Sequence, residues 1–175
     1  MNEINIRKAE TKDSEESIKL IDYVWRIAYR NIFPETVFSE RERRQKVRIE
    51  SFSEDLNNND VLTYVAEYDG KIVAVMSGRK LSRYEYFAKQ NLPDLEILYI
   101  LPEYQGKGIS SKLKNIFQDW LKENHFSKYV IGVLKENEKA RKVYEKWGGK
   151  LEKYTNPFKV GENAAEEVFY TYNVK

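Results

Sequence analysis

With 30 basic and 28 acidic side chains among its 175 residues, the chain has a formal net charge of +2, which supports neither a nucleic-acid partner nor a membrane-surface role. Cysteine is absent, which excludes disulfides, thiolate nucleophiles and cysteine-based zinc sites, and we expect no metal. The length suggests one domain, residues 1–175, and because no apolar run is long enough for a membrane span or a signal peptide, we expect a cytoplasmic location.

The N-terminal segment predicts a strand followed by a helix. Residues 4–7 alternate between apolar and polar side chains, which is typical of a short strand. Asp13 and Glu16 have the spacing of a capping box, so a helix should begin there. The apolar stripe of this helix consists of Ile18, Ile21, Val24, Trp25, Ala28 and Tyr29.

A second helix is predicted after Pro34 interrupts the chain. Ser39 followed by Glu42 suggests its N-terminal cap. The charged run 40–44 is interpreted as a solvated helix face, and 57–60 as a loop.

Two strands joined by a tight turn are predicted next. Val61–Tyr68 and Lys71–Ser77 are β-prone runs, and the Asp69-Gly70 pair between them is a strong hairpin signal. The segment Gly78–Gln90 fits either a strand extension or a loop over a site.

The segment 95–111 predicts a strand, a glycine loop and a helix in that order. Leu95–Leu101 is apolar and β-prone, and Pro102 should end the strand because it cannot donate a ladder hydrogen bond. After the loop Gln105–Ser110, one helical face carries Ile109, Leu113, Ile116, Phe117, Trp120 and Leu121.

This order predicts a phosphate or pyrophosphate site at the loop. A helix start presents free backbone N–H groups and a positive dipole end, and Gly106 and Gly108 have no Cβ to keep a ligand away. The loop is neither a Walker A sequence nor a dinucleotide fingerprint. An ordinary strand-to-helix turn is the alternative.

The chain ends with a predicted strand, a helix and two further strands. Ser127–Leu134 is a buried strand, preceded by His125 at a helix end, and a helix starts at Asn137 and stops at Gly148. The last two strands, with a loop containing Pro157 and Gly161 between them, are Lys150–Tyr154 and Glu166–Val174.

The predicted fold is therefore a mixed α/β fold with the order β-α-α-β-β-β-α-β-α-β-β. An antiparallel N-terminal meander leads into a strand-helix-strand crossover, and both halves should share a single mixed sheet flanked by helices.

Two stretches carry motifs with a defined spacing. Gln105–Ser110 reads Gln-Gly-Lys-Gly-Ile-Ser, and Asn137–Gly148 has the pattern Asn-x-x-Ala-x-x-x-Tyr-x-x-x-Gly. Together they resemble the two signature blocks of the GNAT superfamily of acyl-CoA-dependent N-acyltransferases, and Trp25–Tyr29 is similar to many small bacterial members. Two residues depart from the family pattern: Ser110 replaces a usual Gly or Ala, and Gly149 replaces a common Phe.

The resemblance implies a GNAT-type fold with acetyl-CoA as the acyl donor. Loop amides would hold its pyrophosphate, and its pantetheine arm would lie between two splayed parallel strands, near the backbone of Ile100, with Asn137 as a further partner. The residues implied in binding are Leu98, Tyr99, Ile100, Gln105, Gly106, Lys107, Gly108, Ile109, Ser110, Asn137, Lys139 and Ala140.

Tyr144 is the candidate catalytic acid. A phenol can protonate a departing thiolate, and Tyr144 follows Asn137 by about two helical turns, so both can face one ligand. The alternative is a core aromatic residue beside Val143 and Trp147.

Glu96 is the candidate catalytic base, because an acidic residue is unusual inside an apolar strand. It could accept the proton of an amine through water, or it could point to solvent from the other face of the strand. Asp94 is a weaker substitute.

We therefore predict an N-acetyltransferase that transfers an acetyl group directly to a primary amine in a ternary complex. The alternative is a non-catalytic acyl-CoA-binding or regulatory module. The acceptor could be a polyamine, an amino acid, an aminoglycoside-like drug or a protein N-terminus, selected by the first two helices, the segment Gly78–Gln90 and the Pro157 loop. A homodimer is common among similar proteins.

Overall fold

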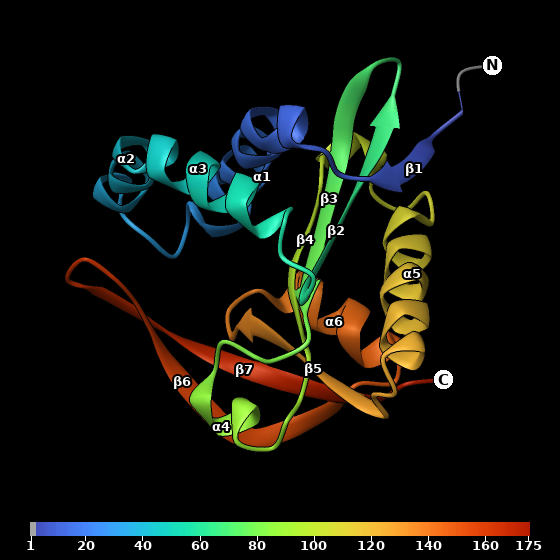
Figure 1. The fold of residues 1–175 in the computed structure, drawn as a ribbon. Helices are drawn as coiled ribbons and strands as arrows, with labels where there is room; N and C mark the ends of the chain where they lie inside the picture. Colours follow the sequence, from blue (N-terminus) through green and yellow to red (C-terminus); the bar gives the residue numbers. More distant parts are fainter. Residues whose placement is uncertain (1–2) are drawn as a thin grey trace.

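The computed structural model describes residues 3–175, which form a seven-stranded sheet with helices on both faces (Figure 1). The strands are β1 (Asn5–Lys8), β2 (Val61–Tyr68), β3 (Lys71–Arg79), β4 (Asp94–Ile100), β5 (Lys128–Leu134), β6 (Lys150–Val160) and β7 (Asn163–Asn173). The helices are α1 (Ser14–Tyr29), α2 (Glu35–Arg43), α3 (Gln45–Asp55), α4 (Glu85–Ala88), α5 (Ile109–Glu123) and α6 (Glu138–Lys146).

The sheet is mixed, as predicted, with the strand order β1-β2-β3-β4-β5-β7-β6. Strands β1 to β4 form the antiparallel meander, β4 and β5 are parallel, and β7 lies between β5 and β6. The hairpin predicted at Asp69-Gly70 is confirmed, because both residues have the positive φ, 52° and 72°, that its two-residue turn requires.

The sheet opens between its two parallel strands. β4 and β5 pair at Asp94 and Val130 and then separate. As a result, the residues from Glu96 to Ile100 are only partly buried, although they belong to a central strand. This opening leaves part of the β4 edge free for another binding partner.

The two faces of the sheet are covered by different helices (Figure 1). On one face, α1 and α3 pack their apolar residues against Val65, Ile72 and Val75. On the other face, the predicted stripe of α5 is buried through Ile109, Leu113, Phe117 and Leu121, with α6 beside it. The glycine loop before α5 therefore lies at the end of β4, next to the opening in the sheet.

The start of the second helix was predicted wrongly. α2 begins at Glu35, directly after Pro34, and Ser39 lies in its middle. Burial of Val37 and Phe38 stabilises this earlier turn of the helix. The charged segment also breaks near Arg44 into a separate helix, α3, which the sequence pattern did not distinguish.

The predicted capping box at the start of α1 is not formed. Asp13 precedes the helix, but its Oδ2 accepts from the backbone N–H of Glu10 at 2.8 Å and from Nη1 of Arg7 at 2.6 Å. Oε1 of Glu16 accepts instead from the backbone N–H of Ile72, at 2.9 Å. Contacts with other parts of the fold therefore take up both carboxylates.

The loop predicted around Pro157 is instead the middle of a long hairpin. β6 runs from Lys150 to Val160, and Pro157 lies opposite Glu166 of β7. The turn itself is at Gly161, as the sequence suggested. Proline is tolerated here because β6 is an edge strand.

The segment Gly78–Gln90, for which the sequence allowed two interpretations, contains the short helix α4. His125 is exposed at the end of α5, as predicted. Within residues 3–175, no helix has the length and apolar character needed to cross a membrane.

Candidate active site

A cavity of about 430 Å³ opens where β4 and β5 separate. The two strands, the glycine loop, α6 and α1 surround it. Among the residues predicted for the site, those that line the cavity are Glu96, Leu98, Tyr99, Ile100, Gln105, Gly106, Ser110, Asn137, Lys139, Ala140 and Tyr144. The fold therefore brings both sequence motifs to one space.

Three predicted residues of the glycine loop lie outside this lining. The side chain of Ile109 is buried in the core, so only its backbone can face a ligand. Gly108 is the N-cap residue of α5. Lys107 is exposed, with its Nζ 4.8 Å from the centre of the Tyr104 ring.

The loop has the geometry of an anion site. Gly106 and Gly108 have φ values of +75° and +79°, and a Cβ on either would meet no atom within 4 Å, so the space beside the backbone is open. No side chain caps α5, and its first turn contains no acidic residue. The free N–H groups and the positive helix end therefore fit a phosphate or pyrophosphate group.

Gln105 links the end of β4 to α6. Its Nε2 donates to the carbonyl oxygen of Ile100 at 2.9 Å, and its Oε1 accepts from Nζ of Lys139 at 2.6 Å. A carbonyl oxygen has two lone pairs, so that of Ile100 can accept a further hydrogen bond from a ligand. This bridge places the Lys139 cation beside the glycine loop.

Asn137 fixes the start of α6 against α1. Its Oδ1 accepts from the backbone N–H of Ala140 at 3.1 Å, which is the N-cap interaction, and its Nδ2 donates to the Tyr29 hydroxyl at 3.0 Å. The Asn-x-x-Ala spacing therefore has a structural role whatever the ligand. Sequence reasoning assigned Tyr29 only to a buried stripe and missed this contact.

Tyr144 lies between the core and the cavity. Its ring centre is 5.7 Å from that of Trp147 and 6.1 Å from that of Tyr170. Its hydroxyl makes no hydrogen bond with any of the residues 3–175, and burial raises its pKa, so the phenol keeps its proton at neutral pH. Such a group can donate a proton or a hydrogen bond to a ligand.

Glu96 faces the cavity with its charge balanced by two arginines. Its Oε2 accepts from Nε of Arg79 at 2.7 Å and its Oε1 from Nη1 of Arg83 at 2.8 Å. The side chain is 17% exposed, so it does not point to bulk solvent. Both arginines come from the end of β3 and the segment after it, and neither pairing has a local pattern in the sequence.

Asp94 is more deeply buried than Glu96, with 1% of its surface exposed. Its Oδ2 accepts from Oγ of Ser82 at 3.2 Å, while its Oδ1 has no hydrogen-bond partner among the described residues. Burial raises the pKa of Asp94 to about 7. The side chain lies at the pairing point of β4 and β5 and does not line the cavity.

The cavity is also lined by residues that the sequence did not assign to the site. Ala28 was predicted to be buried in the α1 stripe, but it is exposed and lines the cavity together with Val24. Among the described residues, no group of three or more acidic, histidine or cysteine side chains could hold a metal ion.

Several solved structures that are named as acetyltransferases share this fold. The PaiA N-acetyltransferase from Thermoplasma acidophilum, in complex with coenzyme A, matches with a TM-score of 0.77 and 20% identity over 97% of this chain and 99% of that chain. A probable acetyltransferase from Staphylococcus epidermidis matches with a TM-score of 0.72 and 17% identity over 100% of both chains. An N-acetyltransferase from Staphylococcus aureus matches with a TM-score of 0.67 and 21% identity over 99% of both.

Identities this low support a shared fold alone, and no curated protein matches the chain. The sequence comparison is more specific, because the model of the acetyltransferase (GNAT) family matches residues 24–149. That range holds both motifs, the opening in the sheet and the candidate Tyr144. The chain therefore belongs to the acetyltransferase (GNAT) family.

Proposed function

We propose that this protein transfers the acetyl group of acetyl-CoA to a primary amine by direct attack in a ternary complex. The observation that carries the proposal is the cavity between β4 and β5, which gathers the glycine loop, the free edge of β4 and the Tyr144 phenol. An anion site, a strand edge and a proton donor in one space suit a long phosphorylated thioester.

The binding residues act on different parts of the donor. The amides of the loop from Gln105 to Ser110 hold the pyrophosphate, and Lys107 and Lys139 add positive charge near it. The open backbone edge of β4, near Ile100, pairs with the amide groups of the pantetheine arm. Leu98, Tyr99 and Ala140 supply the walls.

Two side chains would carry the proton transfers. When bound, acetyl-CoA supplies an acetyl group activated as a thioester. Tyr144 donates its proton, or a hydrogen bond, to the departing sulfur, and its raised pKa keeps that proton available. Glu96, held by Arg79 and Arg83, receives the proton of the attacking amine through water.

The available side chains support direct transfer. The chain has no cysteine, and neither Tyr144 nor Glu96 is arranged as a nucleophile beside a base. The alternative is a non-catalytic acyl-CoA-binding module. The free hydroxyl of Tyr144 in the cavity favours the enzyme, because a binding module has no need for a proton donor at that point.

The Tyr144→Phe variant tests the function. Removing one hydroxyl keeps the ring packing, so stability and acetyl-CoA affinity should stay nearly constant, while kcat should fall about 10²–10⁴-fold if the phenol acts as a general acid. CoA release with a panel of amines, single-turnover rates and calorimetry with acetyl-CoA measure these quantities.

Tyr23→Phe is the matched control, because that tyrosine is exposed on α1. Full kcat in the Tyr144 variant, with chemistry shown to be rate-limiting, would remove Tyr144 from the mechanism. Failure of the wild-type protein to bind acetyl-CoA would contradict the proposed function as a whole.

A further inference from the structure

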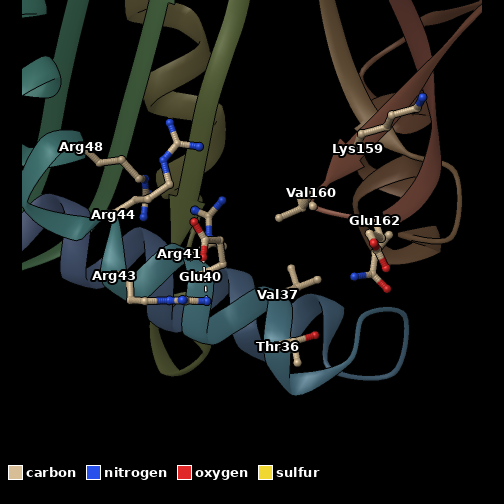
Figure 2. Close-up of a pocket in the computed structure, with 12 residues that line it drawn as sticks. Thr36, Val37, Glu40, Arg41, Arg43, Arg44, Arg48, Lys159, Val160 and Glu162 are labelled. Carbon is tan, nitrogen blue, oxygen red and sulfur yellow. Dashed lines mark ion pairs between the residues drawn. The ribbon is translucent and has the colours of Figure 1, made fainter.

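A second cavity, of about 600 Å³, lies between the α2–α3 segment and the tip of the β6–β7 hairpin. Figure 2 shows basic side chains from α2 and α3 on one side and the hairpin residues Lys159, Val160 and Glu162 on the other. The positively charged residues that line this basic cleft are Arg41, Arg43, Arg44, Arg48 and Lys159. Only Glu40 and Glu162 oppose them among the lining residues.

The acidic groups of the described residues do not balance this charge. Oδ1 of Asp22 is shared between Arg41, at 3.0 Å from its Nη2, and Arg48. Arg43 pairs with Glu40, with 2.7 Å between Nη2 and Oε2. Within residues 3–175, Arg44 and Lys159 have no ion pair, so both cations are available to a ligand.

Arg41 is held in a place that disfavours its charge. Its guanidinium lies 4.2 Å from the centre of the Trp25 ring, and its Nε is buried without a hydrogen-bond partner among the described residues. Burial, followed by repulsion from Arg48, lowers the pKa of Arg41. An anion in the cleft would relieve this repulsion.

The basic cleft is adjacent to the candidate active site. Val37 and Val160 line the cleft, and both pack in a cluster with Tyr29 and Tyr99, which line the catalytic cavity. Burial raises the pKa of the Tyr99 hydroxyl overall, while the charges of Arg41 and Arg48 lower it. The two spaces therefore border the same hydrophobic cluster.

We propose that the basic cleft binds a phosphate or carboxylate group of the amine acceptor, which makes the acceptor an anionic amine. Guanidinium groups recognise both anions through paired hydrogen bonds, and several of them converge here from one side. The identification of the ligand as an acceptor rests on the proposed acetyl transfer.

The same charges disfavour cationic acceptors. A polyamine or an aminoglycoside would approach a surface with five basic side chains, two of which have no ion pair among the described residues, and the carboxylate of Glu96 is already paired with Arg79 and Arg83. Among the acceptors predicted from sequence, an acidic amino acid or a protein N-terminus followed by acidic residues fits the cleft best.

Anion binding can be measured without turnover. Inorganic phosphate is added to the full chain saturated with CoA, and amide and arginine Nε–H resonances are followed by NMR. We expect shifts at residues 36–48 and 159–163, and an apparent Kd at least about tenfold weaker in Arg44→Gln/Lys159→Gln. The double variant should fold, because both side chains are exposed.

The matched control is Lys89→Gln/Lys122→Gln, which removes two exposed charges on α4 and α5. Equal phosphate binding in both double variants, or no shifts at the cleft, would overturn the anion site. If CoA does not bind, the phosphate titration without CoA still reports on the cleft, so the two failures are distinguishable.

The acceptor assignment needs kinetics. A dipeptide with an acidic second residue and its neutral amide analogue present the same attacking amine. The wild-type protein should favour the acidic peptide in kcat/KM, and Arg44→Gln/Lys159→Gln should reduce that preference about tenfold or more, while the affinity for acetyl-CoA stays constant. An unchanged preference, a preference for spermidine, or absence of turnover with any amine would overturn the assignment.

Discussion

Glu96 is an acidic residue in a central strand that is tolerated because two arginines surround it. Arg79 bridges Glu96 and Asp55, with 3.1 Å between its Nη2 and Oδ2 of Asp55. Arg83 pairs with Glu96 and donates to the Tyr84 hydroxyl at 2.9 Å. These contacts hold the carboxylate in one place beside the cavity, which suits a group that must meet an amine at a fixed distance.

The Glu96→Gln variant tests the role of this carboxylate. If the carboxylate receives the proton of the amine, kcat/KM should fall, and most strongly at pH values where the free amine is largely protonated. The affinity for CoA should not change, because Glu96 lies away from the glycine loop. The measurement is a pH–rate profile of both proteins with the same amine.

Asp55→Asn provides the control for this variant, because it removes the other carboxylate partner of Arg79 without altering the cavity. A wild-type profile in Asp55→Asn together with a changed profile in Glu96→Gln would support the catalytic role. Parallel profiles for Glu96→Gln and wild type would leave Glu96 with a structural role only.

The N-terminus of α5 can be tested with a pair of glycines. Gly108 and Gly70 have similar φ values, +79° and +72°, and a Cβ on either meets no atom within 4 Å. Alanine at either position should therefore cost about 1 kcal/mol of stability through backbone strain alone.

The effect on ligand binding should separate the two variants. In Gly108→Ala the new methyl group occupies space beside the phosphate-binding loop, so we expect the affinity for CoA to fall about tenfold, or about 1.4 kcal/mol. Gly70→Ala, in a distant turn, should bind as the wild type does. Urea unfolding and calorimetry measure both quantities, and equal CoA affinities in the two variants would contradict a phosphate site at α5.

Elements with strong local signals were predicted from the sequence. The α5 stripe, the Asp69-Gly70 hairpin and the crossover strands follow from apolar period and turn chemistry, which depend on neighbouring residues. The errors have long-range causes. Asp13 is bound by Arg7 of β1, and Pro157 is accommodated by pairing with β7, and neither contact has a local pattern.

In the candidate site, too, the residues of local motifs were predicted and their long-range partners were not. The two motifs predicted which backbone and side chains meet at the cavity, because their spacing reflects a helix start and two helical turns. The partners of those groups come from elsewhere in the chain: Tyr29 for Asn137, and Arg83 for Glu96. A single sequence contains no signal for such pairs, and the basic cleft likewise forms only when α2 meets the distant hairpin.

The junction of the two parts of the sheet, where β4 meets β5, contains a titratable group. Asp94 pairs with Val130 across β4 and β5, and burial raises its pKa from the ordinary 3.8 to about 7. The folded protein therefore holds this proton more tightly than the unfolded chain. The resulting stabilisation is complete below about pH 4 and is lost as the pH rises through about 7.

Asp94→Asn should remove this dependence, because the amide has no charge at any pH. The free energy of unfolding of the variant, relative to wild type, should increase with pH by about 1 kcal/mol per unit between pH 5 and 7 and then level off. Urea unfolding at several pH values measures the difference, in which the contributions of other groups cancel. A constant difference would mean that Asp94 titrates normally.

The edge strands of the sheet bear on how this protein behaves when it is concentrated. An exposed strand edge can recruit another chain and start an ordered aggregate. β1 is short, and β6 exposes Lys153, Pro157 and Lys159 along its length. Pro157 lacks a backbone N–H donor, and the two lysines repel a second copy of the chain. We therefore expect Pro157, around which a loop was predicted, to help protect the eleven-residue strand β6 from fibre growth.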